Sequence, residues 1–406
     1  MAHIEDRWYK TVIINGRQVQ APKATHGKGL RYRVRYIGPD GRERSESFPD
    51  KRKRDASAFL AQVQADMLKG TYVDPDAGRV TFRQYADEWL SAATCDGSTR
   101  ERLERQFRLH VYPAFGDRAL AAIQPATIRA WGKSLQDSGL AASYRRNLFN
   151  DVSMILNAAV DDRKLLNNPC AVKTVRAPRY VPAKVAPWST DRLASFRAAM
   201  RERYRVAVDL GAGCGLRQGE IFAVSPDDVD TSRRVLHVVR QIKIVWGTLV
   251  FAPPKGGKLR EVPLPDAVTA RLREHADRFT PVPVTLPWAT PDGEPRTVTV
   301  YLSTANSDAL RRPSFNANVW KPAIRAAGVE DTRQNGMHVL RHTYASVLLD
   351  AGESIKALSL YLGHADPGFT LRVYTHLLPT SEDRTRRAID AAFGHGETSP
   401  DGLATA

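Results

Sequence analysis

The sequence predicts a multidomain protein that is mainly α-helical, with small β elements near its start and in its last part. Three observations lead to this fold class. The chain has 406 residues, more than one ordinary domain of about 150 residues. Basic and aromatic residues alternate near the start, and later segments carry apolar residues at helical spacing. We expect five segments, with the bounds 1–78, 79–178, 179–187, 188–394 and 395–406.

The composition indicates an anionic partner. Lysine and arginine number 60 against 44 aspartates and glutamates, which gives a net charge of +16. Such an excess favours nucleic acid, because neutralised phosphates release counterions. The three cysteines form no CxxC pair, which excludes a disulfide scaffold and common zinc fingers. Because no apolar run approaches a membrane span and the start lacks a signal-like segment, we expect a cytoplasmic protein without membrane contact.

Residues 28–72 predict a three-stranded sheet followed by a helix. Two of the strands lie on either side of a Gly-Pro-Asp-Gly turn in RYRVRYIGPDGRERSESF, residues 31–48. Side chains alternate between the faces of a strand, so Tyr32, Val34 and Tyr36 share one face and arginines share the other. That basic face is either simply solvated or binds DNA. The candidate DNA-binding residues are Arg31, Arg33, Arg35, Arg42 and Arg44.

Residues 79–178 predict a helical bundle, because apolar residues recur at helical spacing after four start signals, Thr81, Ser98, Pro125 and Ser143. We expect Pro113 to end the second of these helices. The proline-rich segment that follows the bundle is expected to be a linker, and the last twelve residues a disordered tail.

Residues 188–394 predict a mixed α+β domain. Helices come first, alternating aliphatic residues then predict strands around the turn PPKGGK, and helices resume after Pro313. Residues 281–300 have the pattern of an insertion with its own strand pair, and we assign it no role. The phosphate loop of nucleotide-binding proteins, HExxH, GxSxG and a paired-carboxylate cluster are all absent from the sequence.

Cationic residues stand in distinctive contexts of this third part. Arg217 follows the glycines of GAGCGLRQGE, which we expect to interrupt the chain just before a helix. A guanidinium at a helix N-terminus suits a phosphate, although pairing with Glu220 is the alternative. In HVLRHTYAS, His338 and Arg341 are three residues apart and share a helix face. The pair could bind phosphate oxygens, with the arginine donating in bidentate fashion, or the face could simply be an exposed polar one.

The third context is YLGHADPGFTLRVYTHLLP, with His364 in a turn and Tyr374 ten residues later. A tyrosine with its ordinary pKa near 10 is a poor nucleophile unless cations lower that value. Most tyrosines serve packing, and Tyr344 and Tyr361 lie nearby as other candidates.

The three contexts together, GLRxGE, HxLRHTxAS and LGHxxxxxTxxxYxH, resemble the tyrosine recombinases, also called phage-type integrases. The resemblance covers essentially the whole chain. It implies an arm-type DNA-binding domain first, then a SAM-like core-binding bundle, then the catalytic domain. It also implies that Arg217 and Arg341 clamp the scissile phosphate while histidines assist and a tyrosine attacks. The implied catalytic set is Arg217, Lys255, His338, Arg341, His364 and the nucleophile Tyr374, with Lys258 as the alternative lysine of a β-hairpin turn.

The same resemblance implies a function. The protein would be a site-specific recombinase that integrates and excises a mobile genetic element through a 3′-phosphotyrosyl intermediate, without metal, cofactor or ATP. Implied partners are double-stranded DNA with core and arm sites, three further copies of the chain in a tetramer, an excisionase and a host DNA-bending protein, all at a bacterial nucleoid. The C-terminal segment 375–393 docks either on a neighbouring copy or on its own chain.

Three other functions stay open at this point. A type IB topoisomerase-like enzyme would relax DNA with the same site. A non-catalytic regulator would keep the fold and bind DNA only. A metal-dependent nuclease would use His338, His364 and His376, although it lacks carboxylates at ligand spacing.

Overall fold

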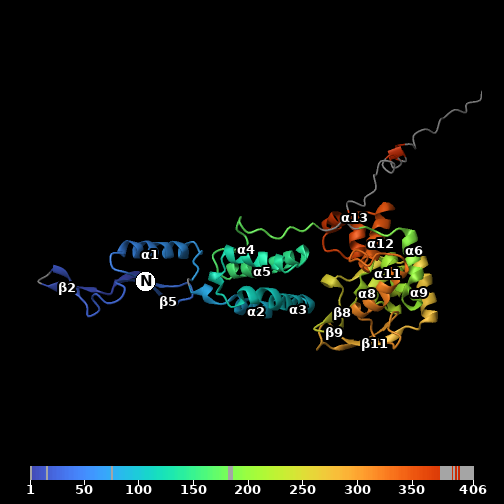
Figure 1. Ribbon diagram of the computed structural model, residues 1–406, viewed down its shortest axis with the longest axis horizontal. Coiled ribbons are helices and arrows are strands. Elements are labelled where there is room, and N and C mark those ends of the chain that lie inside the picture. The colour runs from blue at the N-terminus through green and yellow to red at the C-terminus, as the bar shows by residue number, and fades with distance from the viewer. Residues whose placement is uncertain are drawn as a thin grey trace, which may run out of the picture. The chain divides into compact units, whose positions relative to one another are not determined.

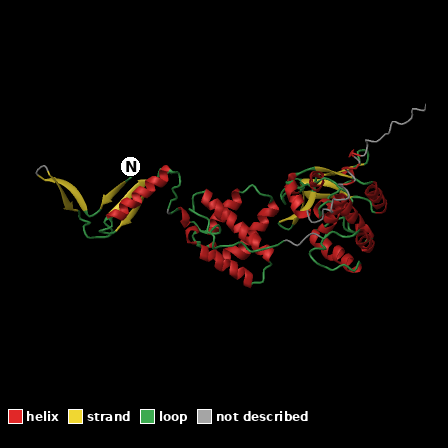
Figure 2. Ribbon diagram, turned by 90° about the horizontal axis from the view of Figure 1, so that it is seen from above, coloured by secondary structure: helices red, strands yellow, loops and turns green. Residues whose placement is uncertain are grey.

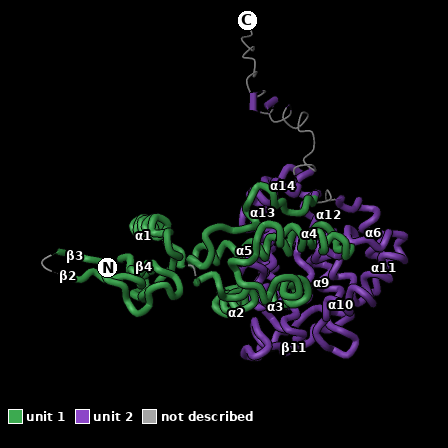
Figure 3. Tube along the Cα trace, turned by 60° about the vertical axis from the view of Figure 1, so that its left-hand side comes forward, with its two compact units in different colours: residues 1–95, 102–180 green, residues 96–101, 181–406 purple. Residues whose placement is uncertain are grey.

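The computed structural model describes residues 2–14, 17–74, 76–181, 186–374, 386, 389–390 and 392–393. The predicted tail, His376 and most of the C-terminal docking segment lie outside these residues. The chain divides into two compact units (Figure 3), of which the first comprises residues 1–95 and 102–180 and the second residues 96–101 and 181–406. Among the described residues, no helix combines the length and apolar character that crossing a membrane requires.

The first unit begins with a three-stranded sheet, as predicted, but its third strand is His3–Asp6 and lies outside the predicted range 28–72. Its antiparallel strands have the order β1-β4-β5, and α1 lies across one face (Figure 1). The alternation of the sequence places Tyr32, Val34 and Tyr36 under that helix, where all three are buried. A separate hairpin, which the sequence analysis did not predict, projects beyond the sheet (Figure 2). The elements are β1 His3–Asp6, β2 Tyr9–Ile14, β3 Arg17–Pro22, β4 Tyr32–Ile37, β5 Glu43–Phe48 and α1 Lys53–Leu68.

The helical bundle follows in the same unit, around its own apolar cluster. Thr81 forms the expected capping box with Gln84, and Pro125 opens a helix. The elements are η1 Ala77–Arg79, α2 Phe82–Ala92, α3 Gly97–Gln106, η2 Phe107–Gly116, η3 Leu120–Ala122, α4 Pro125–Asp137 and α5 Ala142–Asp161. The separate apolar clusters of sheet and bundle support a boundary near residue 78, and the five-segment division stays a prediction.

Three local predictions for the bundle are wrong. Ser143 does not begin its helix, because α5 starts at Ala142 and the residue before it, Ala141, makes no side-chain cap. The start of α3 is capped by Asp96, whose carboxylate accepts hydrogen bonds from the backbone N–H (2.9 Å) and the hydroxyl (2.6 Å) of Ser98. Pro113 does not end a helix, because the chain continues through it to Gly116 in a wider, π-type turn. A wider turn relieves the clash between a proline ring and the preceding turn.

The second unit is the predicted mixed α+β domain. Its elements are α6 Thr190–Ala199, η4 Glu202–Tyr204, α7 Arg205–Cys214, α8 Gln218–Ile221, η5 Pro226–Asp228, β6 Val229–Asp230, β7 Val235–Val238, β8 Gln241–Val245, β9 Thr248–Ala252, η6 Lys255–Gly257, β10 Arg260–Pro263, α9 Asp266–Arg278, β11 Val282–Pro287, β12 Pro295–Val300, α10 Arg312–Phe315, η7 Asn316–Trp320, α11 Lys321–Ala326, α12 His338–Asp350, α13 Ile355–Leu362 and α14 Pro367–Tyr374.

The strands of this unit form three small antiparallel sheets, β10-β7-β6, β8-β9 and β11-β12. The insertion predicted at residues 281–300 is the β11–β12 hairpin. The turn with Lys255 joins β9 to β10, which pair with β8 and β7. The resemblance implied that this lysine lies in the turn of a β-hairpin. That expectation is wrong, because the two strands that flank the turn belong to different sheets.

Helices α7 and α12 pack against each other in the core and position the site. Gly211 lies inside α7, where a Cβ atom would come within 2.7 Å of Leu340. The helix ends at Gly215, which has a φ of +65°. The glycines before Arg217 therefore do not interrupt the chain one after another: the first two permit close helix packing, and the third ends the helix.

Candidate active site

Arg341 lies at the centre of the site, on α12, with 1% of its surface exposed. Its guanidinium donates to the backbone carbonyls of Gly215 (2.7 Å) and Leu362 and to Nε2 of His364 (3.0 Å). Its Nε is buried without a hydrogen-bond partner among the described residues. Burial, reinforced by the charge of Arg217, lowers the pKa of Arg341 to about 9, so the side chain keeps its charge at neutral pH. A buried cation held by neutral carbonyls retains its attraction for an anion.

Arg217 directly precedes α8, near the helix N-terminus as predicted, and it pairs with Glu220, the alternative interpretation. Its guanidinium donates to Glu220 (2.9 Å) and to the carbonyl of Gly363 (3.3 Å). Arg260 donates two hydrogen bonds to the same carboxylate, at 3.0 and 2.7 Å. Burial alone would raise the pKa of Glu220, but the hydrogen bonds and charge of Arg260, with the charge of Arg217, lower it to about 2.

This cluster carries more positive than negative charge. Arg217, Arg260 and Arg341 interact electrostatically and share the one carboxylate of Glu220. Among the described residues no other acid enters their hydrogen-bond network. Three arginines and one carboxylate leave the cluster with two positive charges in excess, which favours the binding of an anion.

His364 extends the cluster towards α14. Its Nδ1 lies 2.7 Å from the hydroxyl of Thr370, and Thr370 lies 2.5 Å from the hydroxyl of Ser359. Because a guanidinium only donates, Nε2 of His364 accepts from Arg341, and Nδ1 carries the hydrogen. Burial, with the charges of Arg341 and Arg217, lowers the pKa of His364 to about 3. The ring is therefore uncharged at neutral pH.

Tyr374 is the last residue of α14, and its side chain is buried. Its hydroxyl lies 2.9 Å from Nδ1 of His342. Burial raises the pKa of Tyr374 to about 12, against the opposite effect of Arg341 and Arg217. The cations therefore do not turn this phenol into a phenolate, contrary to what nucleophilic activation by charge alone would require. A phenol in this state can act as a nucleophile only if its proton is removed during the attack.

A cavity of about 1060 Å³ opens beside the cluster, within the second unit. His338 is exposed on its wall, and its ring packs edge-to-face on His342 with centroids 4.6 Å apart. Additional cations line the cavity and suit a phosphate backbone. The cationic and histidine residues on the wall are Arg217, Lys243, Arg312, Lys321, Arg333, His338 and His342.

The predicted lysine is not part of the hydrogen-bonded cluster. Lys255 and Lys258 are both exposed in the turn between β9 and β10, and neither makes a hydrogen bond or ion pair with another described residue. Gly256 and Gly257, with φ of +79° and +70°, bend this turn. The structure thus brings five of the six predicted catalytic residues around one cavity and one anion site, and leaves the choice of lysine open.

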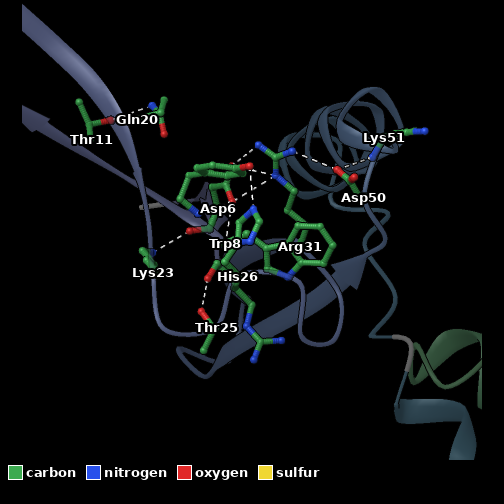
Figure 4. Close-up of polar contacts among 12 residues, drawn as sticks. Asp6, Trp8, Thr11, Gln20, Lys23, Thr25, His26, Arg31, Asp50 and Lys51 are labelled. Atoms are coloured by element: carbon green, nitrogen blue, oxygen red, sulfur yellow. Dashed lines mark hydrogen bonds and ion pairs between the residues drawn. The ribbon is translucent and has the colours of Figure 1, made fainter.

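The five predicted DNA-binding arginines of the N-terminal sheet are differently placed. Arg31 bridges Asp6 (2.9 Å) and Asp50 (3.0 Å), as Figure 4 shows. Arg35 pairs with Glu5 and Glu43, and Arg44 with Asp40 and Asp74. Arg42 is 84% exposed and lies 3.9 Å from Asp40, and Arg33 enters none of these ion pairs. Most of the charge predicted for this face is therefore neutralised within the protein.

The predicted catalytic set did not include His342, Arg260 or Thr370, although His342 and Thr370 stand in the motifs HxLRHTxAS and LGHxxxxxTxxxYxH. A signal for His342 was present, because it lies four residues after His338 and so on the same helix face. Thr370 contacts His364, six positions earlier in the same motif, whereas Arg260 contacts Glu220, 40 positions away in the chain, which no local pattern reveals. Among the described residues, no three His, Cys, Asp or Glu side chains gather where they could hold a metal ion.

Comparisons with known proteins agree with this arrangement. The sequence model of the phage integrase family matches residues 189–380, and that of the phage integrase N-terminal SAM-like domain matches residues 81–136. The integrase of Mycobacterium phage D29 is 27% identical over 373 residues, which cover 88% of this chain and 91% of that protein. A XerC-like tyrosine recombinase of Caldanaerobacter subterraneus is 24% identical over 393 residues, or 89% and 96% of the two chains.

Solved structures share the fold. The Tn1549 transposon integrase in complex with transposon right end DNA superposes with a TM-score of 0.62 at 18% identity, over 78% of this chain and all of that one. A lambda integrase tetramer bound to a Holliday junction gives a TM-score of 0.53 at 17% identity, over 84% and 91% of the two chains.

The fold and the cluster of arginines, histidines and a tyrosine define a class of enzyme that cuts and rejoins DNA strands. The chain belongs to the phage integrase family, the tyrosine recombinases. It is a tyrosine site-specific recombinase, and neither the relaxing enzyme, the regulator nor the nuclease is favoured.

Proposed function

We propose that this recombinase breaks DNA by attack of the Tyr374 hydroxyl on a phosphodiester held by Arg217, Arg341, His338 and His364. The observation that carries the proposal is the surplus of buried positive charge beside that tyrosine. Arg341, with its unpartnered Nε, is held by carbonyls and a neutral imidazole, so its charge remains available to a phosphate.

The attack exchanges the phosphodiester bond for a phosphotyrosyl bond, which retains the energy needed to rejoin the strand. Oη of Tyr374 forms a bond to phosphorus, the bond from phosphorus to the 5′ oxygen breaks, and a 3′-phosphotyrosyl link results. The arginines stabilise the charge that develops on the non-bridging oxygens, for which each such donor contributes about 3–4 kcal/mol. The 5′ oxygen takes a proton from Lys255, or from Lys258 in the same turn. A 5′ hydroxyl of a second strand then reverses the reaction without ATP.

The biological role that fits is integration and excision of a mobile element. The D29 relative is an integrase, and solved relatives bind transposon end DNA or a Holliday junction as a tetramer. We extend these properties to this chain: its substrate is double-stranded DNA with core and arm attachment sites, and its active form is a homotetramer. An excisionase and a host DNA-bending protein would set the direction of the reaction at the nucleoid.

The parts of the chain take separate roles in this proposal. Residues 1–78 bind arm DNA, residues 79–178 bind the core site, and residues 188–394 carry the chemistry. In the arm-binding part, Arg31, Arg35 and Arg44 are closely paired with carboxylates. Arg33 enters no such pair, and Arg42 is 84% exposed with one long contact of 3.9 Å to Asp40, so these two are the arginines left available. The paired arginines position the sheet, and the available ones reach the phosphates.

Covalent trapping tests the function. Wild-type protein and Tyr374→Phe are incubated with fragmented host and element DNA in EDTA and denatured, and the protein-linked DNA is sequenced. We expect wild-type adducts at one short shared core and none from Tyr374→Phe. Adducts scattered without a shared core would instead indicate a relaxing enzyme. A chain lacking residues 1–78 should cut the core normally and fail to integrate; intact integration would contradict the arm assignment.

A further inference from the structure

The hydrogen bond between Tyr374 and His342 is not explained by the catalytic residues discussed so far. His342 was absent from the predicted site, yet its Nδ1 lies 2.9 Å from the oxygen that attacks DNA. It is the side chain that hydrogen-bonds this hydroxyl among the described residues. His342 also lines the cavity that opens beside the cluster.

The chemistry of the pair fixes which atom donates. The Tyr374 hydroxyl is protonated, because burial raises its pKa to about 12. If Nδ1 of His342 carried the hydrogen, the phenol hydrogen would be buried without an acceptor, which costs about 1–3 kcal/mol. Nδ1 therefore accepts from the hydroxyl, and its lone pair points at the proton that must leave.

His342 is also in the right protonation state. Burial, with the charge of the adjacent Arg341, lowers the pKa of His342 to about 4. The groups that face it are Tyr374, His338 and Arg341, and none of them carries a carboxylate. The imidazole is thus neutral and free to accept a proton, and an approaching phosphodiester, being negative, stabilises the imidazolium that results.

We propose that His342 is the general base of strand cleavage, which takes the hydroxyl proton of Tyr374 as that oxygen attacks phosphorus. The inference rests on the proposed function, since it concerns the same nucleophile. The O–H bond of Tyr374 breaks, its proton moves to Nδ1, and the electron pair left on Oη forms the bond to phosphorus. The transfer accompanies attack, because the phenol becomes acidic only as its oxygen bonds to phosphorus. In the reverse reaction the released tyrosine takes the proton back.

The test compares two substitutions at one position. Asparagine at 342 places its carbonyl oxygen near the position of Nδ1, so it keeps the hydrogen-bond acceptor but takes no proton. Single-turnover cleavage of a nicked duplex carrying the trapped core is measured for wild type, His342→Ala and His342→Asn. We expect both variants to be slower by about 10²–10⁴-fold. Added imidazole should restore at least tenfold to His342→Ala, because free imidazole can replace the missing base.

Controls separate this inference from loss of structure and from failure of the proposed function. His237→Asn, on β7 and outside the site, should cleave at the wild-type rate, and thermal unfolding checks that each variant is folded. If wild type itself forms no Tyr374 adduct, the proposed function fails and not only the role of His342. A wild-type rate in His342→Asn would show that the residue only positions the tyrosine. Faster cleavage in His342→Ala would show that the hydrogen bond restrains it. Either result overturns the inference.

A second substrate covers the case in which His342→Ala does not fold. When sulfur replaces the bridging 5′ oxygen, the leaving thiolate needs no proton. Lys255→Ala should then recover its rate, or Lys258→Ala if that lysine is the acid, whereas His342→Asn should stay slow. Recovery of His342→Asn on the sulfur substrate would mean that His342 serves the leaving group, which contradicts the inference.

Discussion

The arginines of the N-terminal sheet and those of the catalytic cluster are opposite solutions to placing cations in a protein. In the sheet, Arg31 lies between two carboxylates, and Arg44 likewise. In the cluster, three arginines share Glu220, and Arg341 is held by backbone carbonyls. Paired arginines hold a surface together. Arginines held by neutral groups can still attract an anionic ligand. The kind of group that a cation contacts therefore indicates a phosphate site better than the number of cations in a region does.

The largest effect on DNA cleavage should come from replacing the guanidinium of Arg341 with an ammonium group. Arg341→Lys keeps a charge but cannot donate in parallel to Gly215, Leu362, His364 and a phosphate. We expect single-turnover cleavage of core DNA to fall at least 10³-fold, whereas Arg44→Lys in the N-terminal sheet should leave it unchanged. Substantial recombination by Arg341→Lys would show that this residue is not a phosphate clamp.

That first contrast also shows how much the sequence could predict. The spacing in HVLRH placed Arg341 on one helix face with His338, and the alternation at residues 32–36 placed the aromatic face of the N-terminal sheet. It could not show that Arg31 meets Asp6, because that pairing depends on the register between β1 and β4. Nor could it show Arg260 at Glu220, 40 residues away. Local patterns predicted helices and strands, and side-chain partners across elements needed the folded chain.

The second largest effect concerns stability: the carboxylate of the catalytic cluster should contribute more to the free energy of unfolding than a carboxylate of the N-terminal sheet. Glu220 is fully buried between Arg217 and Arg260, so Glu220→Gln leaves uncompensated buried charge and should lower the free energy of unfolding by about 3–5 kcal/mol. Asp6 is 28% exposed, and Asp6→Asn should cost at most about 1 kcal/mol. Urea unfolding of both variants measures this. Equal losses would mean that the two clusters are alike.

Acid should weaken the catalytic cluster in two stages. The pKa of His364 falls from 6.5 to about 3 and that of His342 to about 4 on folding. Because the unfolded chain binds these protons first, stability is full above about pH 6.5 and falls below it, by about 1 kcal/mol per histidine by pH 5.5. Protonation of Glu220, with its pKa lowered to about 2, removes more stability below about pH 4.5. In urea unfolding, the free energy of unfolding of His342→Asn should fall less between pH 7.5 and 5.5 than that of the wild type. An equal fall would contradict the lowered pKa of His342.

The smallest expected effect is on the salt dependence of DNA binding, and it should differ between two arginines of the N-terminal sheet. Arg42 is largely exposed, whereas the side chain of Arg44 is 18% exposed between Asp40 and Asp74. For arm-site DNA, Arg42→Gln should reduce the slope of log affinity against log salt by about 1. Arg44→Gln should leave that slope unchanged. The reverse order, measured by fluorescence anisotropy at several salt concentrations, would mean that the ion pairs open on DNA.

The most direct test of the account identifies the residue that carries DNA. Trapped wild-type complexes are digested with nuclease and protease, and the peptides that retain a nucleotide are sequenced by mass spectrometry. The account predicts the modification on Tyr374, and its absence from the same peptide of Tyr374→Phe. A nucleotide on Tyr344, Tyr361 or any other residue would contradict the claim that the charged cluster around Arg341 serves Tyr374.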